Sequence, residues 1–293
     1  MCIRDRSKYG FGLGYSEDKT RNTAADNTGN FRSTSTQTTY SFSPWYSYQL
    51  TERDTLSITG NYVENNYDDG FGGNDNELKQ VTTDWQRQYT ERFSGGLSVA
   101  VSNYQADSTL TSFSVDHDNY NVSALLNYQL SELWLIDGRI GFRSLDSELT
   151  NDFGFKESNT TSGSSFNVSA TRQDEIDTLT IGVSQELSPN QNGGVDEQER
   201  LDVRWSRNLS DTLTASLGAY YLEETSAVRE NSDQKRKYLD LSPSLSWQFE
   251  QNLGLNLSYT YSRQKREVLD TDATGNSIMA TLIYDWDGIR ASR

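Results

Sequence analysis

The sequence lacks several features that define common protein classes. It has one cysteine, Cys2, so an internal disulfide is excluded. No apolar run approaches the ~20 residues that a membrane-spanning helix needs. Proline is scarce, with 3 in 293 residues, as in strand-rich chains. Any insertion into a membrane is therefore predicted to use β-strands in a closed barrel.

Positive charge is also scarce. The chain has 26 Lys and Arg against 42 Asp and Glu, a formal net charge of -16. We expect no nucleic-acid partner, because little positive charge is present to neutralise phosphates. Hydrophobic residues make up 33% of the chain, which is little for a large buried core but normal for a barrel with a hydrated interior.

The clearest structural signal lies between Tyr238 and Arg263. Apolar residues recur at every second position from Leu239 to Phe249, and Asp, Ser and Gln stand between them. After a short polar link, the alternation resumes from Leu253 to Tyr261. A period of two predicts β-strands, so this stretch is a hairpin with one apolar and one polar face. Because the polar face is small and neutral rather than rich in Lys and Glu, we predict that the apolar face contacts lipid.

The same hairpin pattern repeats along the chain. We predict about fourteen strands of roughly 10 residues, the length that a tilted strand needs to cross a bilayer. Short turns should alternate with long polar loops, such as 17–35 and 146–162. A spacing near ~40 residues between turns also suggests propeller blades, but two long strands fill each unit instead of four short ones. The short turns are predicted on one rim, near Glu52, Glu91, Glu132, Glu175, Asp211 and Gln251.

Charges and aromatics support this assignment of faces. Cations on the apolar parity fall next to turns or loops, where they cost ~0 to 1 kcal/mol instead of the ~2 to 4 expected at the bilayer midplane. Aromatic residues cluster near both strand ends, as two membrane-interface belts would. The cations are Arg87, Arg172, Arg207 and Arg263. The belt residues are Tyr48, Tyr89, Tyr128, Trp134, Trp247 and Trp286 at the turn ends, and Tyr15, Tyr62, Tyr120, Tyr221 and Tyr261 at the loop ends.

The chain resembles Gram-negative outer-membrane β-barrels of the porin-like group. The hairpin SPSLSWQF…LGLNLSYTYSR is similar to hairpins of barrels associated with exopolysaccharide biosynthesis and export. The predicted fold class is thus all-β, a transmembrane antiparallel up-and-down barrel over 7–287, and we expect it in the cell outer membrane. The resemblance implies contact with lipid, lipopolysaccharide and the barrel assembly machinery. The tail, 288–293, departs from it, since such barrels commonly end on an aromatic residue.

Residues 1–6, MCIRDR, are treated as a non-native leader. They have neither the apolar core of a signal peptide nor the apolar residues that precede a lipidated cysteine. They are similar to translated adapter sequence at the ends of metagenomic gene fragments. We therefore expect the native N-terminus to lie upstream.

Two stretches suggest chemistry. His117, the single histidine, lies between Asp116 and Asp118 near the loop end of a strand, where omptin-like barrel proteases activate water. The alternative interpretation is a solvated rim histidine, and we predict no enzymatic activity and no cofactor. The segment from Asp68 through Asp69 to Asp75 is rich in oxygen ligands and glycine, as in a calcium loop, but fits no complete ligand spacing. It is the candidate calcium site beside the simpler interpretation of a flexible acidic loop.

The polar face provides the functional prediction. It carries mainly Ser, Thr and Asn, which exchange hydrogen bonds with sugars or water without binding an ion tightly. We predict a passive, porin-like channel for small polar solutes or saccharides, with a non-conducting scaffold for exopolysaccharide export as the alternative. The same residues also fit as small polar fillers of a hydrated barrel. The predicted lumen-lining residues are Asp137, Arg139, Arg143, Asp202, Arg204, Asp240 and Asn256.

Overall fold

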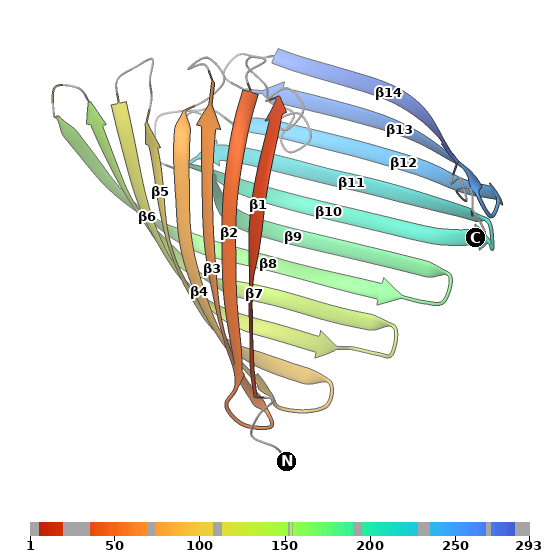
Figure 1. The fold of residues 1–293 in the computed structure, drawn as a ribbon, viewed down its shortest axis with the longest axis horizontal. Coiled ribbons are helices and arrows are strands. Elements are labelled where there is room, and N and C mark those ends of the chain that lie inside the picture. The colour runs from red at the N-terminus through yellow and green to blue at the C-terminus, as the bar shows by residue number, and fades with distance from the viewer. Residues whose placement is uncertain are drawn as a thin grey trace, which may run out of the picture.

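The protein folds as a single antiparallel sheet of 14 strands in sequence order (Figure 1). The computed structural model describes residues 6–19, 36–68, 74–107, 113–151, 153, 155–189, 195–227, 235–267 and 271–284. The strands are β1 (Ser7–Lys19), β2 (Thr36–Gln49), β3 (Asp54–Tyr67), β4 (Asp75–Gln88), β5 (Phe93–Asp107), β6 (Phe113–Gln129), β7 (Trp134–Asn151), β8 (Lys156–Gln173), β9 (Asp177–Pro189), β10 (Val195–Ser210), β11 (Leu213–Ser226), β12 (Arg236–Glu250), β13 (Leu253–Arg266) and β14 (Thr271–Tyr284).

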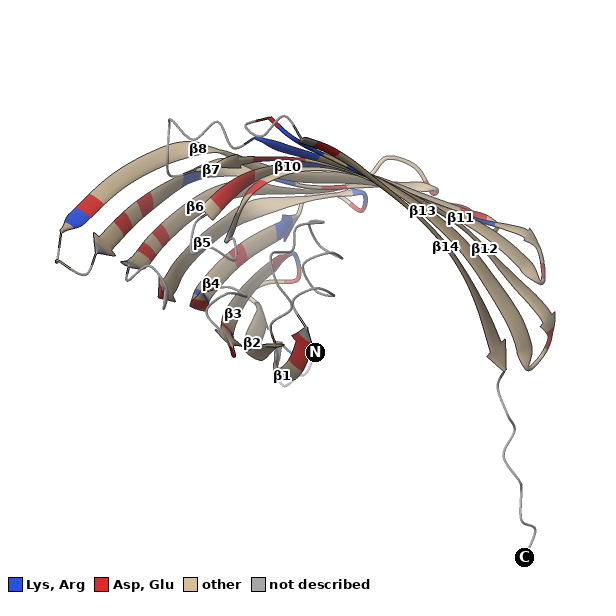
Figure 2. Ribbon diagram, turned by 90° about the horizontal axis from the view of Figure 1, so that it is seen from above, with Lys and Arg blue, Asp and Glu red and all other residues tan. Residues whose placement is uncertain are grey.

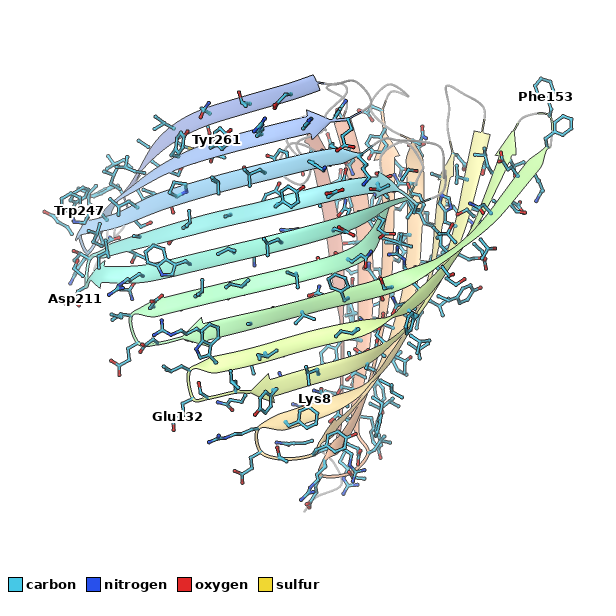
Figure 3. All side chains as sticks on the ribbon, turned by 180° about the vertical axis from the view of Figure 1, so that it is seen from behind. Lys8, Glu132, Phe153, Asp211, Trp247 and Tyr261 are labelled. Carbon is cyan, nitrogen blue, oxygen red and sulfur yellow. The ribbon has the colours of Figure 1, made fainter. Side chains whose placement is uncertain are left out.

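The strand count and the up-and-down order confirm the predicted fold class. Each strand pairs antiparallel with its neighbours in sequence, so the six short connections all lie at one end of the sheet. Figure 3 shows Glu132 and Asp211 at this turn end and Phe153 at the opposite, loop end. The described strands form one continuous sheet and not the separate blades that a propeller would have. Within the described ranges, no helix is long and apolar enough to cross a membrane.

The two faces of the sheet differ as the alternation predicted. In the hairpin of β12 and β13, Trp247 lies opposite Leu255, and Ser246 lies opposite Asn256 on the other face. The same parity continues into β14, where Leu255 pairs with Leu282. We call these two sides the apolar face and the polar face.

The predicted loop at 146–162 is wrong, because the flanking strands extend through most of it. β7 continues to Asn151 and β8 begins at Lys156, with Thr150 opposite Lys156. This part of β8, KESNTTSGSS, is polar on both faces. Apolar alternation therefore gives no signal there, although the backbone ladder continues.

The sheet divides near its loop end between β8 and β9. These strands pair only from Phe166 opposite Gln185 down to Gln173 opposite Thr178, so the loop-end half of β8 is not joined to β9 in the pairing of the described residues. Beyond the division, Val195 of β10 packs in a buried cluster with Tyr104 and Leu145 from the polar face of β5 and β7. The loop ends of β9 and β10 therefore lie against the polar face of β5 and β7.

The sheet is an open arc, and its two edges are β1 and β14. In the described part of the chain, β1 pairs with β2 alone and β14 with β13 alone. Figures 1 and 2 show the turn ends of these two strands well apart. Within the described residues, β1 and β14 do not pair with each other, so the arc does not close into a barrel.

Candidate functional site: the polar face

The register places all seven predicted lumen residues on the polar face. On β7, Asp137 and Arg139 lie opposite Asn127 and Leu125 of β6, and Asp202 on β10 aligns with Tyr220 and then with Asp240 on β12. Their role as pore lining stays a prediction.

An ion pair across four strands shows that the polar face is concave. Arg139 of β7 lies 3.4 Å from the carboxylate of Asp84 on β4. Three strand spacings separate β4 from β7, roughly 14 Å in a flat sheet. Two side chains meet over that span only if the sheet curves toward them. The row between them is built of small residues, Ser98 on β5 and Ser123 on β6, which are fully buried.

Asp137, Asp202 and Asp240 have local hydrogen-bond or ion-pair partners. The Asn127 amide donates to Asp137, and Arg200 lies 2.7 Å from Asp202. Ser242 donates to Asp240 on the same strand. The Asn256 side-chain oxygen is buried and accepts no hydrogen bond from the described residues.

Arg143 is the most deeply buried of the seven. Its side chain is 5% exposed and donates to Glu197 of β10. Glu197 belongs to the apolar parity, since it is four residues before Leu201, yet it reaches the polar face of β7 where β9 and β10 fold over. Gly163 of β8 makes room, because a Cβ there would lie 3.3 Å from the Arg143 guanidinium. This ion pair therefore links the two parts of the sheet at the division.

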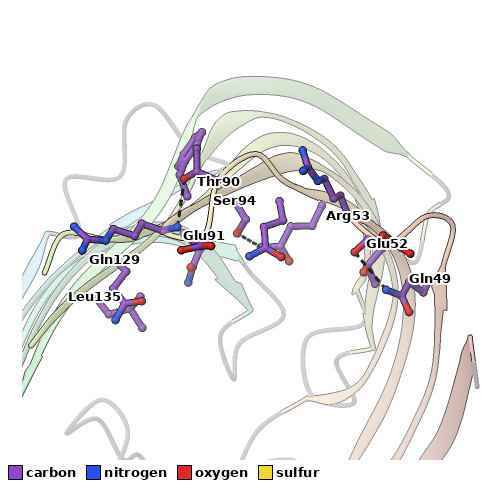
Figure 4. A pocket seen from close by; sticks show the side chains of 14 residues that line it. Gln49, Glu52, Arg53, Thr90, Glu91, Ser94, Gln129 and Leu135 are labelled. Atoms are coloured by element: carbon purple, nitrogen blue, oxygen red, sulfur yellow. Dashed lines mark hydrogen bonds between the residues drawn. The ribbon is translucent and has the colours of Figure 1, made fainter. Parts of the chain in front are cut away.

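A hollow of about 390 Å³ opens at the turn end of the polar face (Figure 4). Its wall is formed mainly by neutral amides and hydroxyls from β2 to β6, with charged residues from the turns at its rim. The Gln86 amide donates to Ser94 across β4 and β5 at 2.8 Å. Neutral donors and acceptors of this kind suit polyhydroxylated solutes. The polar lining residues are Gln49, Thr55, Gln86, Gln88, Thr90, Ser94, Asn127 and Gln129, and the charged ones are Glu52, Arg53, Glu91 and Arg92.

A charged cluster at the loop end of β10 to β12 was not predicted from the sequence. Arg236 donates through Nε to Glu224 at 2.7 Å, and both side chains are about nine-tenths buried. Gln198 donates to the other carboxylate oxygen of Glu224 at 2.7 Å. The alternation along β11 and β12 places Glu224 and Arg236 on the polar face. Nothing in the sequence predicts that their side chains contact each other.

His117 is not a solvated rim histidine. It is 2% exposed, its Nδ1 lies 2.9 Å from the Ser147 hydroxyl, and its ring stacks on Tyr104. Because side chains alternate along a strand, Asp116 and Asp118 project from the opposite face, where Asn103 donates to both. The three residues therefore do not form one catalytic group.

The candidate calcium loop is described only in part. Asp69 lies outside the described residues, while Asp68 is exposed and Asp75 begins β4. The Asp75 carboxylate accepts a hydrogen bond from the Tyr67 backbone N–H at 2.8 Å. Among the described residues, no group of three potential ligands is arranged to hold a metal ion.

No protein-family model matches the chain, and no curated protein matches its sequence. Solved structures share its fold. The FrpB iron transporter of Neisseria meningitidis (F5-1 variant) aligns with a TM-score of 0.62 at 10% identity, over 97% of this chain and 56% of that one. The alcaligin outer-membrane receptor FauA of Bordetella pertussis aligns at 0.55 and 10%, over 97% and 54%. The copper transporter OprC aligns at 0.54 and 9%, over 96% and 60%.

These similarities define the class of the fold. The chain has the strand arrangement of an outer-membrane β-barrel, in agreement with the predicted location in the cell outer membrane. It spans 54 to 60% of the length of these three structures.

Proposed function

We propose that the chain forms the wall of an outer-membrane transport barrel whose concave polar face lines a path for small polar solutes or saccharides. The observation that carries this proposal is the Arg139–Asp84 ion pair, which requires the hydroxyl- and amide-bearing face to curve inward. The convex, apolar face then contacts lipid and lipopolysaccharide, as in other barrels. The barrel assembly machinery would insert such a chain.

The amide-lined hollow supports passive transport of neutral solutes. A set of neutral donors and acceptors binds sugar hydroxyls weakly enough to release them, as conduction requires. The solved structures of similar fold include iron and copper transporters, which supports a transport role in general terms. We assign no catalytic residues to this chain.

A non-conducting scaffold for exopolysaccharide export is the second candidate. One observation favours it: the loop ends of β9 and β10 pack on the concave face around Tyr104 and Leu145, and so fill part of the space that a channel would use. The protease alternative is disfavoured by the separation of His117 from its flanking aspartates.

Single-channel recording of the refolded protein tests the proposal. We expect conductance that is partly blocked by linear oligosaccharides, and about tenfold weaker block in Gln129→Leu, which removes one amide of the hollow. Gln248→Leu is the matched control, because Gln248 lies on the polar face of β12, outside the hollow. Absence of conductance from protein with intact β-structure would refute the channel and favour the scaffold.

A further inference from the structure

Basic residues gather on the convex, apolar face at the loop ends of β12 and β13. Lys235 and Lys237 have the apolar parity of β12, and Arg263 and Lys265 have that of β13. The backbone N–H of Glu267 donates to the Lys235 carbonyl at 3.0 Å, so the two segments stay side by side here. Neighbouring cations are therefore one strand spacing or two residue steps apart, ~5 to 7 Å. We call these four side chains the basic cluster.

Two members of the basic cluster face each other directly. Lys237 lies opposite Lys265 in the ladder between β12 and β13. Like charges at directly opposite positions destabilise a sheet, and an anion held beside both would remove the repulsion. The pair therefore indicates an anionic ligand on the convex face.

The carboxylates around the basic cluster neutralise it only in part. Lys265 is exposed and forms no ion pair with any residue that the structure describes. The other three cations each pair with one carboxylate, but such exposed pairs are weak, so their ammonium and guanidinium groups can bind a further anion. Four cations against three carboxylates leave one positive charge in excess. The pairs are Lys235–Glu223 at 3.4 Å, Lys237–Glu267 at 2.8 Å and Arg263–Asp272 at 2.5 Å.

The basic cluster lies just outside the loop-end aromatic belt. Tyr261 is two residues before Arg263 on the same face of β13. On β11, the Tyr221 hydroxyl donates to Glu223 at 3.3 Å, again one step farther out on that face. Because the tyrosines of such a belt lie at the level of the lipid headgroups, the side chains one step outward contact the headgroup layer.

The opposite part of the same rim is acidic. On the convex face, Asp118 of β6 lies directly opposite Asp146 of β7 (Figure 2). Lys79 of β4 and Lys156 of β8 are single cations on this face, and each pairs with a neighbouring glutamate. The excess of positive charge is thus a local property of β12 and β13 and not of the whole rim.

We propose that the basic cluster binds the phosphate groups of a phosphorylated lipid of the outer leaflet, of the lipopolysaccharide type. Basic side chains beside a membrane attract anionic headgroups, and a guanidinium can donate to two phosphate oxygens at once. The acyl chains then lie on the apolar residues below the cluster, such as Leu239, Leu241 and Tyr261. The inference rests on the outer-membrane placement within the proposed function and not on conduction.

Native mass spectrometry of the refolded protein in detergent tests this site. The probes are lipid A with two phosphates and the same lipid after removal of its phosphates. We expect binding of the phosphorylated form, and about tenfold weaker binding in the double variant Lys237→Gln/Lys265→Gln. The matched control is Lys79→Gln/Lys156→Gln, which removes two charges from the same face outside the basic cluster and should leave binding unchanged.

Circular dichroism establishes that each variant is folded, and Lys265→Gln alone replaces the double variant if that does not fold. Equal weakening in both double variants, equal binding of the phosphate-free lipid, or no binding to folded protein would overturn the proposal. Displacement of the lipid by inorganic phosphate at equal concentration would show a site for free phosphate and would also overturn it. Selective binding by a folded protein that does not conduct would support this site while refuting the channel.

Discussion

Arg139 and Asp84 form an ion pair at 3.4 Å although two strands, β5 and β6, lie between theirs. The contact fixes the direction of curvature, because neither side chain can cross a flat sheet of that width. It therefore separates an inner, polar face from an outer, apolar face.

This ion pair should influence ion selectivity more than stability. Both side chains are about one-third exposed or more, so breaking the pair should cost less than ~1 kcal/mol. Arg139→Gln leaves the Asp84 carboxylate unpaired and should raise the cation-to-anion permeability ratio about twofold, whereas Asp84→Asn should lower it. Reversal potentials under a salt gradient provide the measurement. A shift in the same direction for both variants would contradict an inner location.

Lipid contact of the apolar face can be tested at two neighbouring residues of β13. Leu257 lies between Leu245 and Ala280, and Ser258 lies on the opposite face between Ser244 and Met279. Leu257→Arg should lower the free energy of unfolding by ~2 to 4 kcal/mol, because it places a cation between the two aromatic belts, and Ser258→Arg should cost far less. Urea titrations in lipid vesicles measure both. Equal costs would refute the assignment of faces.

The packing of the loop ends at the division between β8 and β9 should depend on the ion pair of Arg143. Its side chain is buried against Glu197, so Glu197→Gln leaves a buried guanidinium without its counter-charge and should cost ~3 kcal/mol. As a control, Arg172 pairs with Asp174 and Asp177 near the turn end and is 33% exposed. Arg172→Gln should cost less than ~1 kcal/mol. If both variants unfold at the same urea concentration, the loop-end packing contributes little.

The excess of acidic over basic residues should give a channel a weak preference for cations, and this preference should depend on the salt concentration. With a formal net charge of -16, the chain raises the local cation concentration where its charges are not screened. The preference should fade as the Debye length falls from ~30 Å at 0.01 M to ~3 Å at 1 M. Selectivity measured over this range is the test. Anion selectivity at low salt would be the contrary result.

The sequence alone determined the class of fold and the order of its strands. Side-chain alternation has a period of two in any strand, so the apolar and polar faces of β12 and β13 and all six short turns were readable from local pattern. Loop-end strand extensions such as Ser158 to Ser164 were not, because residues that are polar on both faces give no alternation.

Only the tertiary structure decided which side chains meet across the sheet. His117 gave no local sign of its contact with Ser147, and Glu197 has the parity of the apolar face yet reaches Arg143. The curvature between β4 and β7 and the inward fold of β9 and β10 arise from contacts between distant strands. Alternation fixes the face on which a residue lies, but the bend of the sheet sets the distance between two residues on that face.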